Sequence, residues 1–216
     1  MNLTVWPITQ SGTNHENSMK TFSYFLFNKP YSVLCQFTGK KGRKTLGDYL
    51  YLPPDIYPVG RLDADSEGLV LLTNDGKTAQ RLLNPKFCHP RTYLVQVERI
   101  PLPGALQKLR GGVIIEGKKT LPAVIKLLEN EPDIPARPVP VRFRLNVPTA
   151  WLEITLYEGR NRQIRKMTAA VGHPTLRLLR IGIGGLKLDR LQPGRWRELT
   201  RREIIEFKKT SGLTPE

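Results

Sequence analysis

Residues 60–68 have the sequence Gly-Arg-Leu-Asp-Ala-Asp-Ser-Glu-Gly, and Leu-Val-Leu-Leu follows directly at residues 69–72. The glycines at the two ends, Gly60 and Gly68, predict a tight loop whose backbone another chain can approach closely. The apolar run ends at Thr-Asn-Asp-Gly, residues 73–76, and this pattern predicts a fully buried strand followed by a turn. The stretch therefore places three carboxylates and one arginine on a loop that leads into the core of a folded domain.

Three interpretations of this loop compete. Asp side chains in loops usually cap backbone amides, so an acidic turn is the simplest interpretation. A calcium loop would use Asp63, Asp65 and Glu67 as its first ligands, but its last position is Asn74 rather than Glu, and a hydrophobic strand replaces the helix that should follow. In the third interpretation one carboxylate is catalytic. The loop alone does not decide between the first and the third.

The rest of the chain shows strand patterns at irregular intervals. Tyr93, Val95 and Val97 occupy alternate positions and therefore share one face of a predicted strand over residues 92–98. Further strands or strand-like pieces are predicted at residues 22–27, 113–116, 123–128 and 151–157.

The strongest helical pattern spans residues 160–171. Its apolar residues recur at helical spacing, at Ile164, Met167, Thr168 and Val171. The basic residues Arg162, Arg165 and Lys166 lie together on a neighbouring face of the same predicted helix. Other helices are predicted at residues 45–50 and 102–110 and from Thr200, which has capping-box spacing to Glu203. Because strands and helices mix without a regular strand–helix–strand rhythm, we expect an α+β fold.

The composition indicates a globular protein that binds a polyanion. The chain has 216 residues, 39% of them hydrophobic, and 34 Lys and Arg against 19 Asp and Glu give a net charge of +15. The sequence shows neither an apolar run long enough to span a bilayer nor the apolar stretch of a secretory signal. Two cysteines, Cys35 and Cys88, are too few for a disulfide framework or a zinc knuckle. We therefore expect a cytoplasmic protein with nucleic acid, and no membrane, as its partner.

The positive charge is concentrated in one stretch. Residues 159–202 contain twelve basic and two acidic residues, which amounts to +10 of the total. Because the basic residues are interleaved with apolar ones, the stretch predicts a folded phosphate-binding surface rather than a merely solvated face. A second basic cluster, Lys40, Lys41, Arg43 and Lys44, lies nearer the N-terminus.

Four parts of the chain match, in order, the motifs of a known enzyme family. They are Leu26–Tyr31, then Gly60–Asp63 with Ser66–Gly76, then Arg91–Val95, and finally Glu158–Met167 with Gly172–Pro174 and Leu176–Arg180. Over residues 22–200 the chain resembles the RsuA-type family of RNA pseudouridine synthases, and within it the large-subunit rRNA enzymes. The resemblance implies a mixed, mainly antiparallel β-sheet flanked by helices, with a central active-site cleft. It also implies isomerisation of a specific uridine in 23S ribosomal RNA without a cofactor or a metal.

The resemblance assigns roles to individual residues. By motif position Asp63 is the catalytic carboxylate, and Arg165 is the basic residue that pairs with it. Tyr93 matches the tyrosine that stacks on the target uracil and helps to remove the C5 proton. Arg61 is expected to fill the gap that a flipped-out base leaves in the RNA stack, or to bind phosphate. Asp65 and Glu67 are expected only to stabilise the turn and cap the loop.

A larger set of basic residues is expected to contact RNA phosphates. The set comprises Lys29, Lys40, Lys41, Arg43, Lys44, Arg160, Arg162, Lys166, Arg177 and Arg180. We expect a flexible tail at residues 1–21, the catalytic domain at 22–208 and a second tail at 209–216. Nothing before residue 22 could hold the S4 RNA-binding domain that most of the family carries, so targeting should rest on the catalytic domain, which we expect to be monomeric.

Two other functions remain open from the sequence. One is a ribosome-associated RNA-binding protein that kept the fold and lost the chemistry, although it would have no use for Asp63, Tyr93 and Arg165 together. The other is a synthase that acts on small-subunit rRNA. A zinc deaminase is disfavoured, because the chain has only two cysteines and no His-x-Glu motif.

Overall fold

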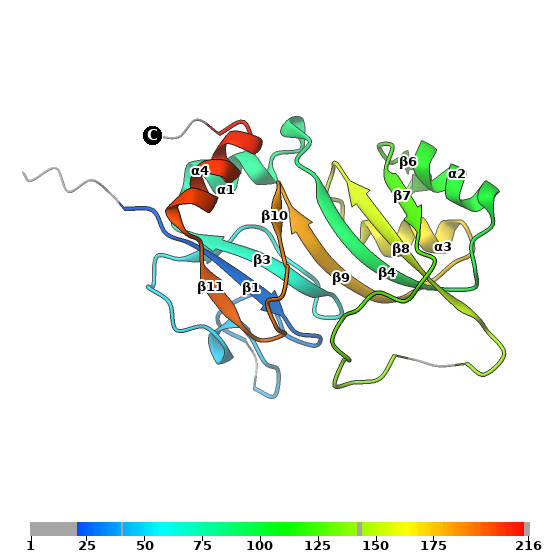
Figure 1. Cartoon of the computed structure of the whole chain (residues 1–216), viewed down its shortest axis with the longest axis horizontal. Helices are drawn as coiled ribbons and strands as arrows, with labels where there is room; N and C mark the ends of the chain where they lie inside the picture. The colour runs from blue at the N-terminus through cyan, green and yellow to red at the C-terminus, as the bar shows by residue number, and fades with distance from the viewer. Residues whose placement is uncertain (1–20, 40, 142–143, 214–216) are drawn as a thin grey trace, which may run out of the picture.

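The computed structural model of the protein describes residues 21–39, 41–141 and 144–213. The predicted tail at residues 1–21 lies outside this part of the chain except for Thr21. The described residues form a nine-stranded sheet with the central order β11-β1-β3-β9-β4-β8-β7, and β2 and β10 pair with β3 and β9 (Figure 1). The strands are β1 (Tyr24–Lys29), β2 (Tyr57–Pro58), β3 (Glu67–Thr73), β4 (Arg91–Glu98), β7 (Val124–Leu127), β8 (Thr149–Leu156), β9 (Thr175–Ile183), β10 (Leu186–Lys187) and β11 (Trp196–Glu198).

Four α-helices and a small hairpin complete the described architecture. The helices are α1 (Gly76–Leu83), α2 (Pro103–Gly111), α3 (Gln163–Ala170) and α4 (Arg201–Thr210), and the hairpin is β5 (Ile114–Ile115) with β6 (Lys118–Lys119). Two short 3-10 helices are η1 (Leu46–Asp48) and η2 (Pro85–Phe87). The pairing of β3 with β9 is parallel and the other pairings in the sheet are antiparallel. The α+β prediction with a mainly antiparallel sheet is therefore confirmed.

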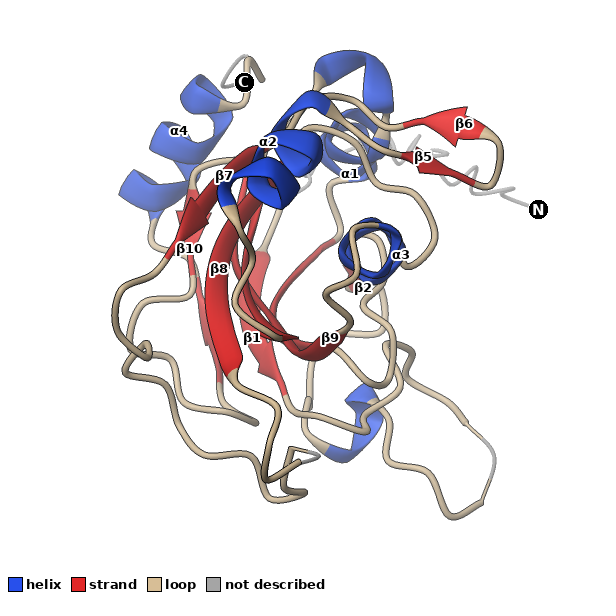
Figure 2. Ribbon diagram, turned by 90° about the vertical axis from the view of Figure 1, so that its right-hand side faces the viewer, coloured by secondary structure: helices blue, strands red, loops and turns tan. Residues whose placement is uncertain are grey.

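Both faces of the sheet are buried, because helices cover each of them. Ile164 of α3 and Leu109 of α2 belong to the core on one face, and Leu82 of α1 and Phe207 of α4 belong to the core on the other. Figure 2 shows α3 and α4 on opposite sides of the sheet. This arrangement explains why residues 69–72 of β3 are an unbroken apolar run, since their side chains alternate between the two cores.

Gly68 lets the loop at residues 60–67 enter the centre of the sheet. It lies opposite Arg180 in the parallel pair β3–β9, with a φ of +102°. A Cβ atom at this position would lie 2.3 Å from the carbonyl oxygen of Arg180. Only glycine permits both the left-handed backbone and this close approach. The glycine predicted to end a tight loop thus places that loop directly beside β9.

Several predicted elements are confirmed and three need correction. The alternation in β4 holds, because Tyr93, Val95 and Val97 lie in one core. The capping box at Thr200 is present at the start of α4. Helix α1 was not predicted, because only a turn was expected at residues 73–76. The carboxylate of Asp75 accepts a hydrogen bond from the backbone N–H of Thr78 and caps the N-terminus of this helix.

The other two corrections concern helix boundaries. Helix α3 begins at Gln163 rather than at residue 160, because Arg162 adopts a left-handed backbone with a φ of +51°. Helix α4 continues through Thr210, Ser211 is buried, and Leu213 packs against the core, so the predicted C-terminal tail cannot begin at residue 209. In the described part of the chain, no helix is long and apolar enough to cross a membrane.

Candidate active site

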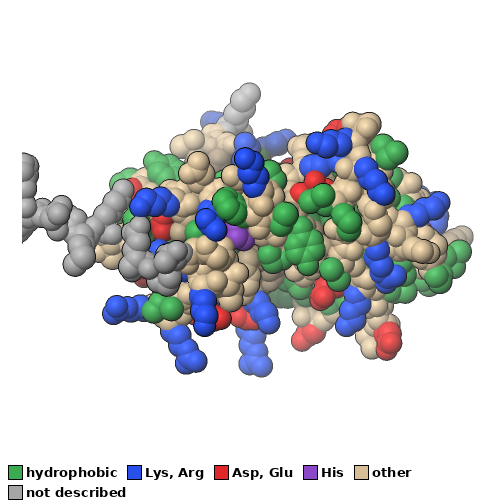
Figure 3. Space-filling model, turned by 90° about the horizontal axis from the view of Figure 1, so that it is seen from above, with side chains coloured by type: hydrophobic (Ala, Val, Ile, Leu, Met, Phe, Trp, Pro, Cys, Tyr) green, Lys and Arg blue, Asp and Glu red, His purple; other side chains and the backbone are tan. Residues whose placement is uncertain are grey.

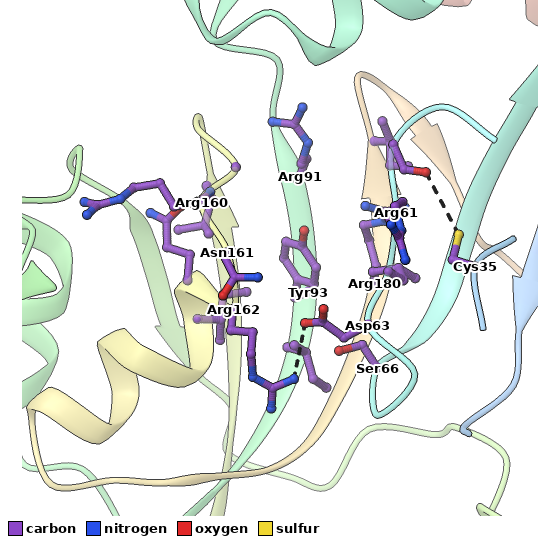
Figure 4. Close-up of a pocket in the computed structure, with 18 of the residues that line it drawn as sticks. Cys35, Arg61, Asp63, Ser66, Arg91, Tyr93, Arg160, Asn161, Arg162 and Arg180 are labelled. Carbon is purple, nitrogen blue, oxygen red and sulfur yellow. Dashed lines mark hydrogen bonds and ion pairs between the residues drawn. The ribbon is translucent and has the colours of Figure 1, made fainter. Parts of the chain in front are cut away.

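A cavity of about 590 Å³ opens between the loop that precedes β3, the middle of the sheet and the start of α3. Its walls carry Asp63 and Arg61 from the loop, Tyr93 from β4, Arg180 from β9 and Arg162 from the start of α3 (Figure 4). Segments that are far apart in the sequence therefore converge on one site. Asp63 lines this cavity, together with Tyr93.

Two hydrogen bonds hold the loop of Asp63. The backbone N–H of Ser66 donates to the carbonyl oxygen of Asp63 at 3.1 Å and closes a turn. The backbone N–H of Ser32 donates to the carbonyl oxygen of Ala64 at 2.7 Å, which ties the turn to the segment after β1. The side chain of Asp63 is 38% exposed, and its carboxylate points into the cavity beside Tyr93 (Figure 4). A backbone fixed on both sides thus presents an accessible carboxylate.

Tyr93 stands in the middle of the cavity wall. It pairs with Arg180 across β4 and β9, and its ring lies next to Asp63 (Figure 4). Its exposed fraction is 9%, so most of the ring is fixed by packing while one side faces the cavity. Asp63 and Tyr93, which the sequence predicts to act together, are brought together by the fold.

The position of Arg165 differs from the prediction. Its Nη2 donates to the backbone carbonyl of Asp65 at 2.7 Å, and its Nε lies 3.4 Å from the Asp65 carboxylate. The guanidinium nearest to Asp63 is that of Arg162, with Nη1 3.5 Å from Oδ2 of Asp63. Arg165 is not among the residues that line the cavity, and in this structure its ion pair is with Asp65 rather than with Asp63 as predicted.

Asp65 joins the loop to α3. Its carboxylate accepts two hydrogen bonds from Arg162, at 3.0 and 2.7 Å. Burial raises the pKa of Asp65, but the hydrogen bond from Arg162 and the charges of Arg165 and Arg162 outweigh it, so the pKa lies below its usual value. Asp65 is therefore a charged partner of two arginines at neutral pH, and its role exceeds the turn stabilisation predicted from the sequence.

Comparison with known proteins decides the family. The family described as RNA pseudouridylate synthase matches the chain over residues 23–170. The chain belongs to this family. It is an RNA pseudouridine synthase, an isomerase.

Its relatives and structural neighbours agree with this assignment. Ribosomal large subunit pseudouridine synthase E of Vibrio vulnificus is 49% identical over 192 residues, which cover 87% of this chain and 81% of that protein. The enzyme of the same name from Xanthomonas campestris is 52% identical over 174 residues, which cover 80% and 92%. A crystal structure of a pseudouridylate synthase has a TM-score of 0.72 and 29% identity, over 87% of this chain and 74% of that one. The structure of an H/ACA RNP bound to a substrate RNA, at 16% identity, a TM-score of 0.54 and coverage of 89% and 56%, shows the shared fold alone.

Three residues of the predicted phosphate-binding set of this pseudouridine synthase are buried, and two of them, Lys29 and Arg177, bind oxygen atoms of the protein itself. The Nζ of Lys29 donates to the carbonyl oxygens of Pro30 and Val33, at 2.9 and 2.8 Å, and Lys29 is fully buried. Arg177 forms two hydrogen bonds with the Glu67 carboxylate, at 3.0 and 2.9 Å, on the other face of the sheet. The prediction that Lys29 and Arg177 contact phosphate is therefore wrong: both charges are used inside the protein.

Burial of Lys29 makes stability depend on pH. Burial lowers its pKa from 10.5 to about 8, although nearby Cys35 and Glu67 act against this shift. From about pH 8 to 10.5 the unfolded chain keeps a proton on Lys29 that the folded protein releases, so this residue's contribution to stability rises with pH. We expect the unfolding free energy of the wild type minus that of Lys29→Met to rise by up to ~3 kcal/mol between pH 7 and pH 10. Urea unfolding of both proteins at the two pH values measures this change. A pH-independent difference would contradict this.

Arg180 also differs from the predicted surface role. It is 4% exposed, its Nε donates to the carbonyl oxygen of Leu69 at 2.8 Å, and its Nη2 is buried without a hydrogen-bond partner among the described residues. It lines the cavity of Asp63 instead of an outer surface. Arg91, which the sequence analysis missed, lines the same cavity, and burial together with the charge of Arg180 lowers its pKa. Its position two residues before Tyr93, on the same strand face, was the available signal.

The remaining basic residues of the set lie nearer the surface. Arg160 donates to the carbonyl oxygens of Ile115 and Lys118, and Lys166 pairs with Glu116 at 2.6 Å, so both hold the β5–β6 hairpin against α3. The exposed members are Arg61, Lys41, Arg43, Lys44 and Arg162, whereas Lys40 lies outside the described residues. On the face seen in Figure 3, basic side chains are widely spread, and acidic side chains lie among them. Contact of these residues with RNA stays a prediction.

Proposed function

We propose that this protein converts a specific uridine of bacterial 23S ribosomal RNA to pseudouridine, with Asp63 as the catalytic carboxylate. The observation that carries the proposal is the shared cavity of Asp63 and Tyr93, whose volume of about 590 Å³ suits a single nucleotide. The relatives named as large-subunit enzymes, at about half identity over most of both chains, support the choice of 23S rRNA. Asp63 and Tyr93 come from the same chain, so the proposed site needs no second copy, and we propose that the protein acts as a monomer in the cytoplasm, where bacterial ribosomal RNA is found.

The reaction needs a carboxylate and no imported group. The N1–C1′ bond of the uridine breaks, the uracil turns, and C5 bonds to C1′; C5 loses its proton and N1 gains one, so substrate and product are isomers. Asp63 can serve by attack at C1′, by addition at C6, or by removing a sugar proton on a glycal route. Each route requires a carboxylate oxygen at the sugar or the base. Asp63 meets this requirement because it faces the cavity from a loop held at both ends.

The other cavity residues fit a flipped nucleotide. A base must leave its stack to reach Asp63, since the carboxylate lies inside the cavity. The ring of Tyr93, fixed in the wall, offers a surface on which the uracil can stack. Arg180 lines the same wall, and its buried Nη2 has no hydrogen-bond partner among the described residues. Arg61, exposed at the cavity, is the residue placed to occupy the space that the base leaves.

Affinity for RNA should depend steeply on salt, because phosphate contacts release counterions. We expect the triple variant Lys41→Ala, Arg43→Ala and Lys44→Ala to bind rRNA about tenfold more weakly and to reduce the slope of log K against log salt by about 2. Filter binding between low and physiological ionic strength measures both quantities. Alanine at the exposed Lys108, Lys126 and Lys209, which lie outside the predicted set, is the control with the same charge change. Equal effects of the two triple variants would contradict the surface assignment.

Tritium release tests the proposed function. Unmodified 23S and 16S rRNA are labelled with tritium at C5 of uridine and incubated with the wild-type protein. We expect release from 23S rRNA, free or in a precursor particle, because C5 loses its proton during the reaction. Release from 16S rRNA alone would instead assign a small-subunit substrate. No release from either, with RNA binding intact, would favour the non-catalytic RNA-binding protein.

A further inference from the structure

Asp65 lies at the active site, yet no step of the reaction uses it. Its carboxylate accepts hydrogen bonds from Nη1 and Nη2 of Arg162, at 3.0 and 2.7 Å. Its backbone carbonyl accepts a third, from Nη2 of Arg165 at 2.7 Å. One residue thus binds the start of α3 through its side chain and its main chain. Arg162 is at the same time 3.5 Å from Asp63, so a single guanidinium lies between two carboxylates that are two residues apart.

Stability does not explain the pair of Asp65 and Arg162. Their side chains are 35% and 41% exposed, and ion pairs this accessible contribute little to folding. Arg162 also has a left-handed backbone, with a φ of +51°, and no side-chain hydrogen bond caps α3. A non-glycine residue keeps such a conformation only where its surroundings impose it, and such residues cluster at functional sites. What the pair does accomplish is to fix the guanidinium of Arg162 in one place.

We propose that Asp65 is a positioning residue that restrains Arg162 and so keeps the Asp63 carboxylate open to the nucleotide. Arginine binds a carboxylate most strongly through two parallel hydrogen bonds, and the Asp65 carboxylate accepts two such bonds from Arg162. Without the charge of Asp65, the next carboxylate is Asp63, already 3.5 Å away. Arg162 would then close over Asp63 and occupy the oxygens that must reach the sugar or the base. This inference rests on the proposed catalytic role of Asp63.

The variant Asp65→Asn removes the charge and keeps the size of the side chain. We expect kcat for tritium release to fall about 10- to 100-fold, since Arg162 now covers Asp63 in most molecules. The affinity for rRNA should stay within about twofold of the wild type, because the exposed basic residues are unchanged. Asp65→Glu, which retains a carboxylate able to hold Arg162, should recover part of the lost kcat. Unchanged kcat in Asp65→Asn would overturn the proposal.

A double-mutant cycle with Arg162→Ala separates restraint of Arg162 from a merely structural role. If Asp65 acts by restraining this arginine, Asp65→Asn should cost less than about twofold in kcat once Arg162 is absent. A structural role would instead give the same loss with or without Arg162. Equal losses in the two backgrounds would therefore overturn the proposal, even if Asp65→Asn alone were impaired. Circular dichroism of each variant confirms that it is folded.

The control with the same charge change is Asp133→Asn. Asp133 is exposed and lines the second cavity, on the other face of the sheet, and it does not line the cavity of Asp63. Its turnover should equal that of the wild type. The activity of the wild type distinguishes failure of this inference from failure of the proposed function. If the wild type and Asp65→Asn release tritium at the same rate, Asp65 does not act by restraining Arg162, and the synthase function stands. If the wild type releases none, the proposed function fails and this inference falls with it.

Discussion

Asp63→Asn is expected to abolish tritium release from C5-labelled 23S rRNA, with a loss of at least ~10⁴-fold, equivalent to about 5 kcal/mol of transition-state stabilisation. The amide keeps the shape of the side chain but is a poor nucleophile and a poor base, so each of the three routes open to the carboxylate is lost. The fold should remain intact, because the side chain is 38% exposed and the loop is held by backbone hydrogen bonds. Single-turnover release at saturating protein measures the chemical step directly.

Two further measurements make the Asp63→Asn result specific. Filter binding should show rRNA affinity close to that of the wild type, so that the loss lies in turnover rather than in binding. Asp133→Asn, purified in parallel from a strain without the native enzyme, should be fully active. An Asp63→Asn protein that still releases tritium under these conditions would refute the catalytic assignment.

Gly68→Ala is expected to destabilise the protein by about 4 kcal/mol or more. Losses of this size are exceptional among single substitutions and arise where a defined structural requirement is broken. A Cβ atom here would meet the carbonyl oxygen and the backbone nitrogen of Arg180, at 2.3 and 2.7 Å, in the middle of the sheet. The φ of +102° adds strain for any residue with a Cβ. Neither problem can be relieved by a side-chain rotation. Thermal unfolding should show a melting temperature lower by ~10 °C or more.

Gly104→Ala is the matched control. Gly104 lies in the first turn of α2, with no atom within 4 Å of an added Cβ and no left-handed backbone. Alanine is the better helix former, so stability should change by no more than about 1 kcal/mol, in the stabilising direction. If the two glycine variants unfolded at the same temperature, the close approach of β3 and β9 would not be the constraint described here.

Local patterns predict the parts of the fold and the site that depend on neighbouring residues. The apolar run after Gly68 predicts the buried strand β3, because a strand covered on both faces needs apolar side chains at each position. Alternation along β4 predicts that Tyr93 shares a face with Val95 and Val97. The capping box predicts the start of α4 at Thr200. For Asp63 and Tyr93, motif position adds the chemistry that the pattern alone leaves open.

What the sequence analysis missed depends on partners that are remote along the chain. Arg177 looks like any other basic residue in its segment, and only the fold brings Glu67 to it, 110 positions away. Lys29 is buried because two carbonyl oxygens of the turn after β1 face its ammonium group. Arg165 contacts Asp65, whereas the arginine 3.5 Å from Asp63 is Arg162, which has a left-handed backbone that the helical pattern did not predict. Charge counted along a sequence therefore overstates the charge available to RNA.

The central place of β9 affects how the protein acquires its activity. Strand β9 comes late in the chain, but it inserts between β3 and β4, and the edge pair joins β1 to β11 near the other end. Contacts between residues so distant in sequence close large loops and slow folding. During translation Asp63 and Tyr93 leave the ribosome long before the strand that joins their halves of the sheet. Until β9 has been synthesised, the nascent chain lacks the strand that lies between β3 and β4, so we expect the cavity of Asp63 and Tyr93 to form only after β9 has left the ribosome.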